Sequence, residues 1–219
     1  MNQTLAFLND LKTNNNRDWF NANKHRYTDA LHEFELLVSK LIYNISLFDH
    51  SINNLEAKQC IFRIFKDVRF SKNKEPYKTN FGAYICRNGG RKSKFAGYYI
   101  HIQPGESFLS GGLYMPESAV LTRIREDIDV YYDDLISIIE NPAFKQYFAQ
   151  LCGDKLKTTP RGYAKNNPAA DFLKYKDIYV MHALTDKQVL DSNFIEHSTD
   201  IYKQLTPFNN FFNRAIEDM

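Results

Sequence analysis

The first fifty residues have the hydrophobic spacing of helices. Leucines recur every three residues from Leu5 to Leu11 after Thr4, which is a candidate N-cap, and three asparagines at 14–16 end this short helix. From Trp19 to Phe48 apolar residues return every three or four positions, as on one face of an amphipathic helix. We therefore expect one long helix there, whose apolar stripe covers a sheet or other helices.

After residue 59 the hydrophobic period changes to two, which is typical of strands. In the segment Cys60 to Phe70 one face carries Phe62, Ile64, Val68 and Phe70, and the other carries Arg63, Asp67 and Arg69. We predict a strand with a charged outer face. We also expect its apolar side chains to be buried together with Ile100 and Ile102.

Three more strands follow at short intervals, and turns separate them at Asn88-Gly89-Gly90 and at Pro104-Gly105. The expected strands are Phe81 to Cys86, Phe95 to Gln103 and Phe108 to Tyr114. Connections this short produce an antiparallel meander.

The second half of the chain returns to helical spacing. The expected elements are a helix between Leu121 and Ile139, a short helix from Asn141-Pro142, a possible strand Lys176 to Leu184, and helices from Ser192 and Pro207. The pattern predicts an α+β protein in which helices flank an antiparallel meander sheet, folded as a single domain over residues 1–219.

Composition limits the partners of the chain. Its formal net charge of +2 creates no long-range field, so nucleic acid remains possible but unsupported, and any anion must be met by a local patch. Cys60, Cys86 and Cys152 have no metal-ligand spacing and indicate free thiols. The chain shows no nucleotide, hydrolase or zinc-protease motif. We expect no metal, no cofactor, no membrane partner and a cytoplasmic location.

Basic residues are concentrated between residues 63 and 78. Two acids, Asp67 and Glu75, lie among six basic side chains, namely Arg63, Lys66, Arg69, Lys72, Lys74 and Lys78. Arginine forks and lysine point charges suit phosphate or carboxylate, so this segment predicts anion binding. The alternative is a solvated sheet face with a lysine-rich edge loop that discourages edge pairing.

Strand parity adds further candidates to this basic face. Tyr99 and His101 share a face opposite Ile100 and Ile102, so they could join the charged side of the sheet. His101 and Asp67 are weak candidates for an acid and base, because a lone histidine is more often structural and Asp67 fits a structural ion pair on the sheet better. Arg161, on a Pro-Gly loop, is another candidate ligand-binding cation or else part of a plain surface turn.

We expect Arg63, Arg69 and His101 to lie close together in a concave basic site. A second candidate wall is formed by the segment NNNRDWFNANKHRY, where Trp19 either anchors the helix start in the core or stacks on a ligand. The site prediction depends on the first strand sharing a sheet with the strand that carries His101.

Four segments resemble, in the same order, the blocks of a widespread bacterial and fungal family catalogued as domain of unknown function 2461. They are RDWFNANKHRY, FRIFKDVRFSKNKEPYKTNFGA, GYYIHIQPGESFLSGGLYMP and LKTTPRGY. The resemblance spans nearly the whole chain and implies one conserved-hypothetical domain. It implies no activity and assigns no functional residue.

The leading hypothesis is therefore a domain that binds a phosphate-bearing ligand or another small anion on a basic sheet face. One alternative is an enzyme acting on a small phosphorylated or carboxylated substrate, which a deep pocket would favour over a flat basic face. Another is a protein-interaction module that uses exposed aromatic side chains.

Overall fold

The computed structural model describes residues 1–67, 69, 74–217 and 219. In chain order the elements are α1 (Asn2–Thr13), α2 (Arg17–Ala22), α3 (Lys24–Ser46), η1 (His50–Ile52), α4 (Ala57–Cys60), β1 (Phe81–Ile85), η2 (Gly90–Lys92), β2 (Gly97–Ile102), β3 (Ser107–Leu113), α5 (Ser118–Val130), α6 (Tyr132–Ile139), α7 (Pro142–Lys145), α8 (Ala170–Leu173), β4 (Ile178–Leu184), α9 (Asp186–Val189) and α10 (Phe194–Ile216). The α+β class predicted from the sequence is confirmed.

The four strands form one antiparallel sheet in the order β1-β2-β3-β4. Tyr84 lies opposite Tyr99, and His101 lies opposite Phe108. The predicted meander is confirmed, and the possible strand Lys176 to Leu184 appears as the edge strand β4. The Asn88-Gly89-Gly90 turn is confirmed too, because all three residues have positive φ.

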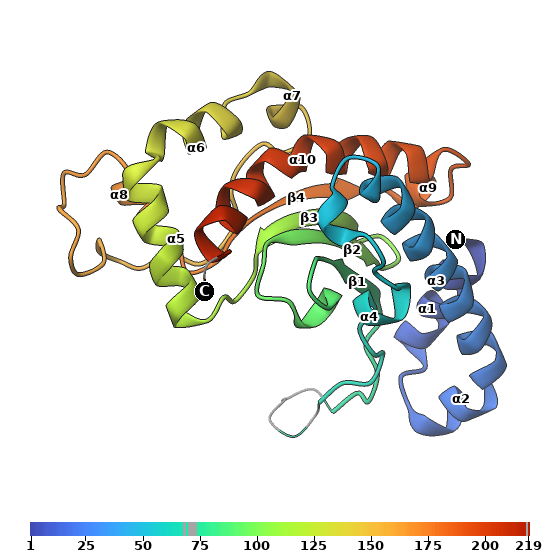
Figure 1. Cartoon of the computed structure of the whole chain (residues 1–219). Coiled ribbons are helices and arrows are strands. Elements are labelled where there is room, and N and C mark those ends of the chain that lie inside the picture. The colour runs from blue at the N-terminus through green and yellow to red at the C-terminus, as the bar shows by residue number, and fades with distance from the viewer. Residues whose placement is uncertain (68, 70–73, 218) are drawn as a thin grey trace.

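Helices α3 and α10 pack on the sheet, and in Figure 1 α10 lies above the strands while α3 runs beside β1. The side chains that point to this layer alternate along the strands, and Phe81, Ile100, Ile102, Leu109 and Val180 are all buried. They belong to one hydrophobic cluster that also includes the inner sides of α1 and α5. The predicted burial of Ile100 and Ile102 is confirmed.

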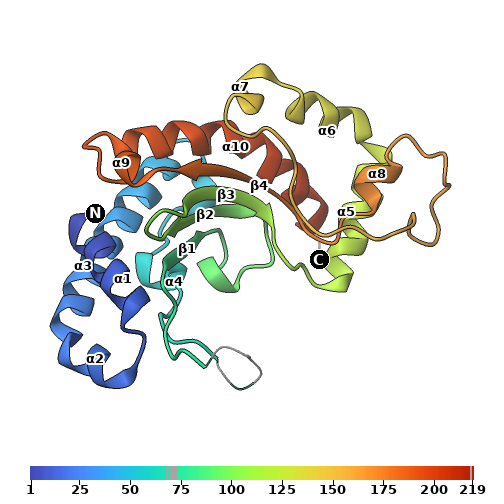
Figure 2. The same ribbon diagram turned by 180° about the vertical axis from the view of Figure 1, so that it is seen from behind.

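Helices α5 to α8 connect β3 to β4 and gather at one end of the molecule (Figure 2). The predicted helix between Leu121 and Ile139 is divided at Tyr131, where the backbone leaves the helical region. The two predicted C-terminal helices are one continuous α10 that runs through Pro207. The interior proline removes one backbone donor, and burial of the apolar side of α10 outweighs that loss.

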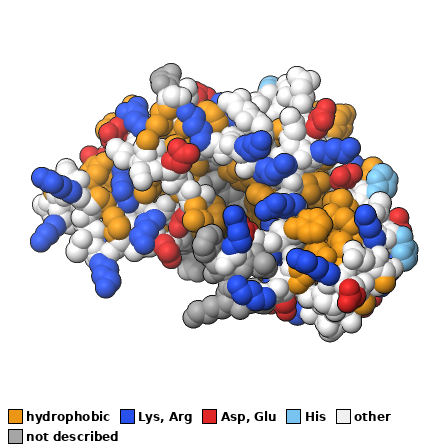
Figure 3. Space-filling view, turned by 90° about the horizontal axis from the view of Figure 1, so that it is seen from below, with side chains coloured by type: hydrophobic (Ala, Val, Ile, Leu, Met, Phe, Trp, Pro, Cys, Tyr) orange, Lys and Arg blue, Asp and Glu red, His pale blue; other side chains and the backbone are white. Residues whose placement is uncertain are grey.

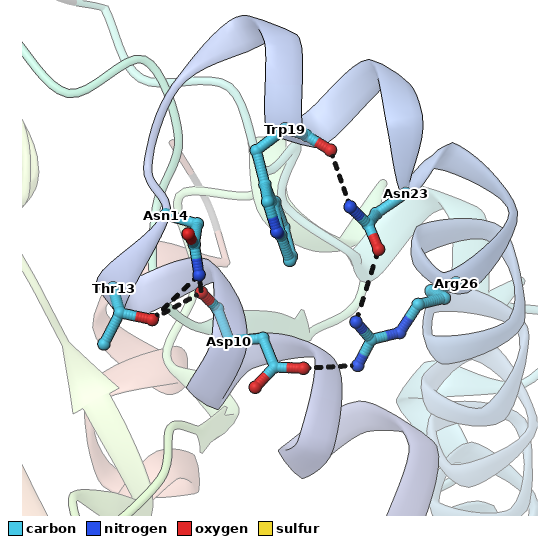
Figure 4. Close-up of polar contacts among 6 residues, drawn as sticks. All are labelled: Asp10, Thr13, Asn14, Trp19, Asn23 and Arg26. Atoms are coloured by element: carbon cyan, nitrogen blue, oxygen red, sulfur yellow. Dashed lines mark hydrogen bonds and ion pairs between the residues drawn. The ribbon is translucent and has the colours of Figure 1, made fainter.

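The predicted long helix begins with a break. Asn23 separates α2 from α3, and its side chain donates to the Trp19 carbonyl oxygen at 2.9 Å while it accepts from Arg26 at 3.3 Å. Arg26 also pairs with Asp10 of α1 at 2.6 Å, so these side chains join three helices (Figure 4). Trp19 stacks on Phe7 with ring centroids 6.0 Å apart. This segment anchors helices to one another.

The predicted N-cap at Thr4 is wrong, because α1 begins at Asn2 and Thr4 lies inside it. Thr4 is fully buried, and its hydroxyl donates to the Ala30 carbonyl oxygen at 3.0 Å. A polar side chain at the start of an apolar repeat can therefore serve packing between helices rather than capping.

The predicted strand Cys60 to Phe70 is also wrong. Residues up to Cys60 form α4, and the next residues make only isolated bridges, Ile61 with Ala83 of β1 and Phe65 with Tyr77. The backbone N–H of Lys66 donates to Pro76 at 2.9 Å. The chain therefore pairs with itself as an arm that extends from the β1 edge, visible below the sheet in Figure 1.

Within the described residues of this arm, 61–67, 69 and 74–78, the apolar side chains of Phe62 and Ile64 do not share one face. Ile64 is buried in the core, whereas Phe62 is half-buried and contacts Tyr99 on the opposite side of the sheet. The predicted burial of Phe62 with Ile100 is therefore wrong. Val68 and Phe70 lie outside the described residues. At Phe62 and Ile64 the period-two pattern therefore corresponds to contacts with two different surfaces rather than to one face of a strand.

Candidate anion-binding cavity

The sheet face opposite α3 and α10 is hollowed, with a cavity of about 710 Å³. Every strand contributes to its floor, through Tyr84, Tyr99, His101, Phe108 and Tyr179. These side chains point away from the helical layer because successive residues of a strand alternate in direction. Figure 3 views the molecule from this side, where Lys and Arg side chains lie among hydrophobic ones.

Aromatic rings extend from the floor to the edges of the cavity. Phe62 approaches from the arm and meets Tyr99 edge-on, with ring centroids 6.3 Å apart. Tyr114 follows β3 and meets Tyr179 edge-on at 5.7 Å. The cavity is thus bounded by rings on both the β1 side and the β4 side.

Two hydroxyl groups of the floor are turned toward protein acceptors. The hydroxyl of Tyr84 contacts the carbonyl oxygens of Phe95 at 2.8 Å and Gly112 at 3.1 Å, and Ser110 donates to Val180 at 2.6 Å. Burial raises the pKa of Tyr84 well above its ordinary value. These two hydroxyl groups are therefore bound to the protein rather than available to a ligand in the cavity.

A chain of hydrogen bonds fixes His101 on the floor. The Tyr99 hydroxyl lies 3.1 Å from His101 Nδ1, and His101 Nε2 lies 3.1 Å from Gln103 Oε1. Gln103 in turn donates its amide to Glu106. Because that donation orients the Gln103 oxygen toward His101, the ring carries its proton on Nε2 and accepts at Nδ1.

Both titratable groups at the centre of the floor are neutral near pH 7. Burial lowers the pKa of His101 and outweighs the opposite effects of the Gln103 hydrogen bond and the Glu106 charge, while the charge of Lys78 adds the smallest effect, which also lowers it. Burial raises the pKa of Tyr99 to about 12. A neutral donor–acceptor pair therefore lies beneath the cavity.

Gly82 on β1 allows Tyr99 to lie across the sheet. A Cβ atom at Gly82 would come within 2.5 Å of the Tyr99 hydroxyl oxygen and within 3.3 Å of two ring carbons. Only a residue without a side chain fits below this ring.

Lys78 is the most distinctive charge of the cavity. It is half-buried, its Nζ lies 5.6 Å from the centroid of the Phe62 ring, and its backbone N–H donates to Ile64 at 2.8 Å. Among the described residues, no carboxylate forms an ion pair with it. Burial lowers the pKa of Lys78, and Arg63 adds a smaller effect of the same sign.

Other basic side chains surround the cavity in the connection between β1 and β2. Arg91 donates to the carbonyl oxygens of Lys58, Gln59 and Ile61 and so holds α4 in place. Lys94 contacts the Met219 oxygen at 2.6 Å, whereas Lys92 is exposed. Glu117, beyond β3, is the acidic side chain among the lining residues that the structure describes.

The structure divides the predicted ligand-binding residues between different places. Lys78, Tyr99 and His101 line the cavity. Lys66 pairs with Glu75 at 3.1 Å on the arm. Lys74 is exposed on the arm, and Lys72 lies outside the described residues.

Arg63 and Arg69 are exposed on the arm and do not line the cavity, and Arg69 binds Asp67 at 2.6 Å. Their predicted grouping with His101 rested on a strand that the arm does not form. Arg161 is exposed on the loop before α8 and is not a lining residue either. A role of these three arginines in ligand binding stays a prediction.

Several cavity residues escaped the sequence analysis although the sequence carries a signal for them. Strand parity places Tyr84 of β1 and Phe108 of β3 on the face of His101, since they pair across the strands. Tyr179 follows from the same rule once β4 is placed beside β3. Lys92 ends η2, which is too short for a periodicity that would indicate the direction of its side chain.

Comparison with known sequences identifies the family. Residues 3–211 match the family described as conserved hypothetical protein (DUF2461). Neither a curated protein nor a solved structure gave a match. Within the part of the chain that the structure describes, no helix is both long and apolar enough to span a bilayer. Because the match covers nearly the whole sequence, the chain belongs to the DUF2461 family of conserved hypothetical proteins.

Proposed function

We propose that this protein binds a small anionic ligand, bearing a phosphate or a carboxylate, in the cavity on the open face of its sheet. The observation that carries the proposal is the position of Lys78. Lys78 is half-buried, its ammonium group lies over the Phe62 ring, and it has no ionic partner among the described residues, so it gains most from a ligand anion.

The surroundings of Lys78 support the same conclusion. Lys92 and Lys94 also line the cavity, so basic side chains outnumber the acidic one there. A volume of about 710 Å³ lies within the range of small-molecule sites. A charged group enclosed by low-dielectric walls attracts an anion more strongly than an exposed lysine does.

Acid–base catalysis by His101 and Asp67 receives less support than binding. Both ring nitrogens of His101 face protein groups, Tyr99 on one side and Gln103 on the other. Asp67 is bound to Arg69 on the arm and does not line the cavity. An enzyme that used this pair would need both side chains within reach of one substrate.

A calorimetric titration with inorganic phosphate at low ionic strength tests the proposal. We expect binding by the wild-type protein and at least a tenfold loss of affinity in Lys78→Met, which keeps the length of the side chain but removes its charge. Lys165→Met is the matched control, since Lys165 is exposed on the loop before α8. Equal affinities for the two variants, or no binding at all, would contradict the proposal.

We also infer a cytoplasmic location. Cys60 and Cys86 are buried as free thiols and Cys152 is free and half-buried, a state that reducing compartments maintain. Cell fractionation tests this inference, and recovery of the protein in an extracellular fraction would contradict it.

A further inference from the structure

The cavity is larger than an inorganic anion requires. Its volume of about 710 Å³ compares with roughly 30 Å³ for the share of one water molecule in the liquid, and a phosphate group has only a few times that size. A ligand that fills the site must therefore carry a sizeable body besides its anionic group.

The floor shows what kind of body it accommodates. His101 and Phe108 are stacked with centroids 4.5 Å apart and an interplanar angle of 10°, and Tyr99 lies 5.8 Å from Phe108. The hydroxyls of Tyr84 and Ser110 are bound to carbonyl oxygens of the protein. A body rich in hydroxyl groups would find few partners on this floor and would lose its hydration without compensation.

Charge is distributed unevenly across the cavity. Lys78 precedes β1, and three further basic lining residues lie in the connection from β1 to β2, namely Arg91, Lys92 and Lys94. The basic side chains of the lining therefore belong to segments next to β1. The β4 side carries Tyr179 and Met181, and Glu117 follows the neighbouring strand β3. An anionic head is therefore favoured at one side only, and the other side favours an apolar body.

The β4 side also exposes apolar surface at its edge. Tyr114 and Met115 are 71% and 73% exposed, and the Tyr114 ring stands edge-on to Tyr179. Exposed aromatic surface beside a cavity gains free energy when a flat apolar group covers it.

These features specify the ligand further, in an inference that rests on the proposed function. We infer that the ligand is an aryl acid, in which a planar aromatic body lies against Tyr99, Phe108 and Tyr179 and a single phosphate or carboxylate reaches Lys78. Sugar phosphates and inorganic anions share the head group with it but lack the body that the floor accommodates.

A calorimetric comparison of naphthyl phosphate, glycerol phosphate, inorganic phosphate and naphthol tests the inference. We expect naphthyl phosphate to bind at least tenfold more tightly than the other three probes, because it alone of the four combines a phosphate group with aromatic rings. Naphthoate, run in parallel, distinguishes a carboxylate from a phosphate head. Glycerol phosphate binding as tightly as naphthyl phosphate would overturn the aryl class and leave the anion site standing. Naphthol binding equally tightly, or no binding by any anion, would overturn the proposed function itself.

Two variants locate the aromatic body. Phe108→Leu keeps an apolar side chain but removes the flat ring, and Tyr114→Ala removes an exposed ring whose loss leaves the core untouched. We expect each variant to lower the affinity for naphthyl phosphate at least threefold and to leave the affinity for inorganic phosphate unchanged. Unchanged naphthyl phosphate affinity in folded Tyr114→Ala and Phe108→Leu would overturn the inferred placement.

Discussion

The hydroxyl of Tyr99 lies 3.1 Å from Nδ1 of His101, two residues further along β2 and on the same face of the sheet. Asn80 Nδ2 approaches the same nitrogen at 3.5 Å. Two donors directed at one ring nitrogen require that it accept, so His101 is held in its neutral form. Tyr99 and His101 thus form an uncharged pair at the centre of the floor, and the charged side chains of the lining lie around it.

The neutral state of His101 predicts a loss of stability in acid. Because its pKa in the folded protein is below the ordinary value of 6.5, the unfolded chain binds more protons between these two values. The free energy of unfolding should therefore decrease as the pH falls through this interval. Urea unfolding at about pH 7.5 and about pH 5 measures the change.

The variant His101→Gln isolates this contribution, since glutamine is uncharged at both pH values. Glu106, Lys78 and Tyr99 are the charged or titratable groups that interact with the histidine, and they remain in the variant. We expect a smaller acid-dependent loss than in the wild type. An identical loss in both proteins would show that His101 does not titrate differently in the folded state.

Lys78 should reduce the stability of the unliganded protein. Burial without a carboxylate partner among the described residues disfavours its charged form, as its lowered pKa indicates. Lys78→Met should raise the melting temperature by about 2 °C while it lowers anion affinity, a typical exchange between stability and function. Thermal unfolding with circular dichroism measures this change, and a lower melting temperature would indicate a structural role.

Gly82 should be intolerant of a side chain because of Tyr99. The variant Gly82→Ala places a Cβ atom 2.5 Å from the Tyr99 hydroxyl oxygen, and we expect a loss of about 1 to 3 kcal/mol in unfolding free energy. Combining it with Tyr99→Phe removes the closest atom. Urea unfolding of the four proteins gives the coupling energy, and additive effects would mean that the two residues do not meet.

The variant Arg69→Ala tests whether the ligand binds in the cavity or on the arm. The Arg69 guanidinium is 76% exposed and bound to Asp67, away from the cavity lining. Arg69→Ala should therefore change phosphate affinity by less than about twofold, since exposed charges are screened by solvent. A tenfold loss by calorimetry would move the site to the arm.

The sheet and part of the cavity floor were accessible from the sequence. Alternation along β2 placed Tyr99 and His101 opposite Ile100, because the side-chain period of a strand is fixed by its backbone. The same period misled at residues 60–70, where the backbone of Lys66 pairs within the arm. Period alone does not reveal which partner satisfies a backbone N–H group.

The basic residues between 63 and 78 show a second limit of prediction from sequence. Arg63 and Lys78 are both basic residues of one segment, but only Lys78 lines the cavity. The position of Lys78 depends on the hydrogen bond from its backbone N–H to the Ile64 carbonyl oxygen, a contact between residues fourteen positions apart. Composition identifies such a cluster as basic, whereas tertiary pairing decides which of its members is enclosed and which is solvated.

The most direct measurement of the central claim is a phosphate titration followed by two-dimensional NMR. The account predicts that the side-chain signals of Lys78 and the ring signals of His101 shift with one common dissociation constant, while those of Arg69 and Arg161 stay in place. Shifts concentrated on Arg69 or Arg161, with Lys78 and His101 unchanged at saturating phosphate, would contradict it.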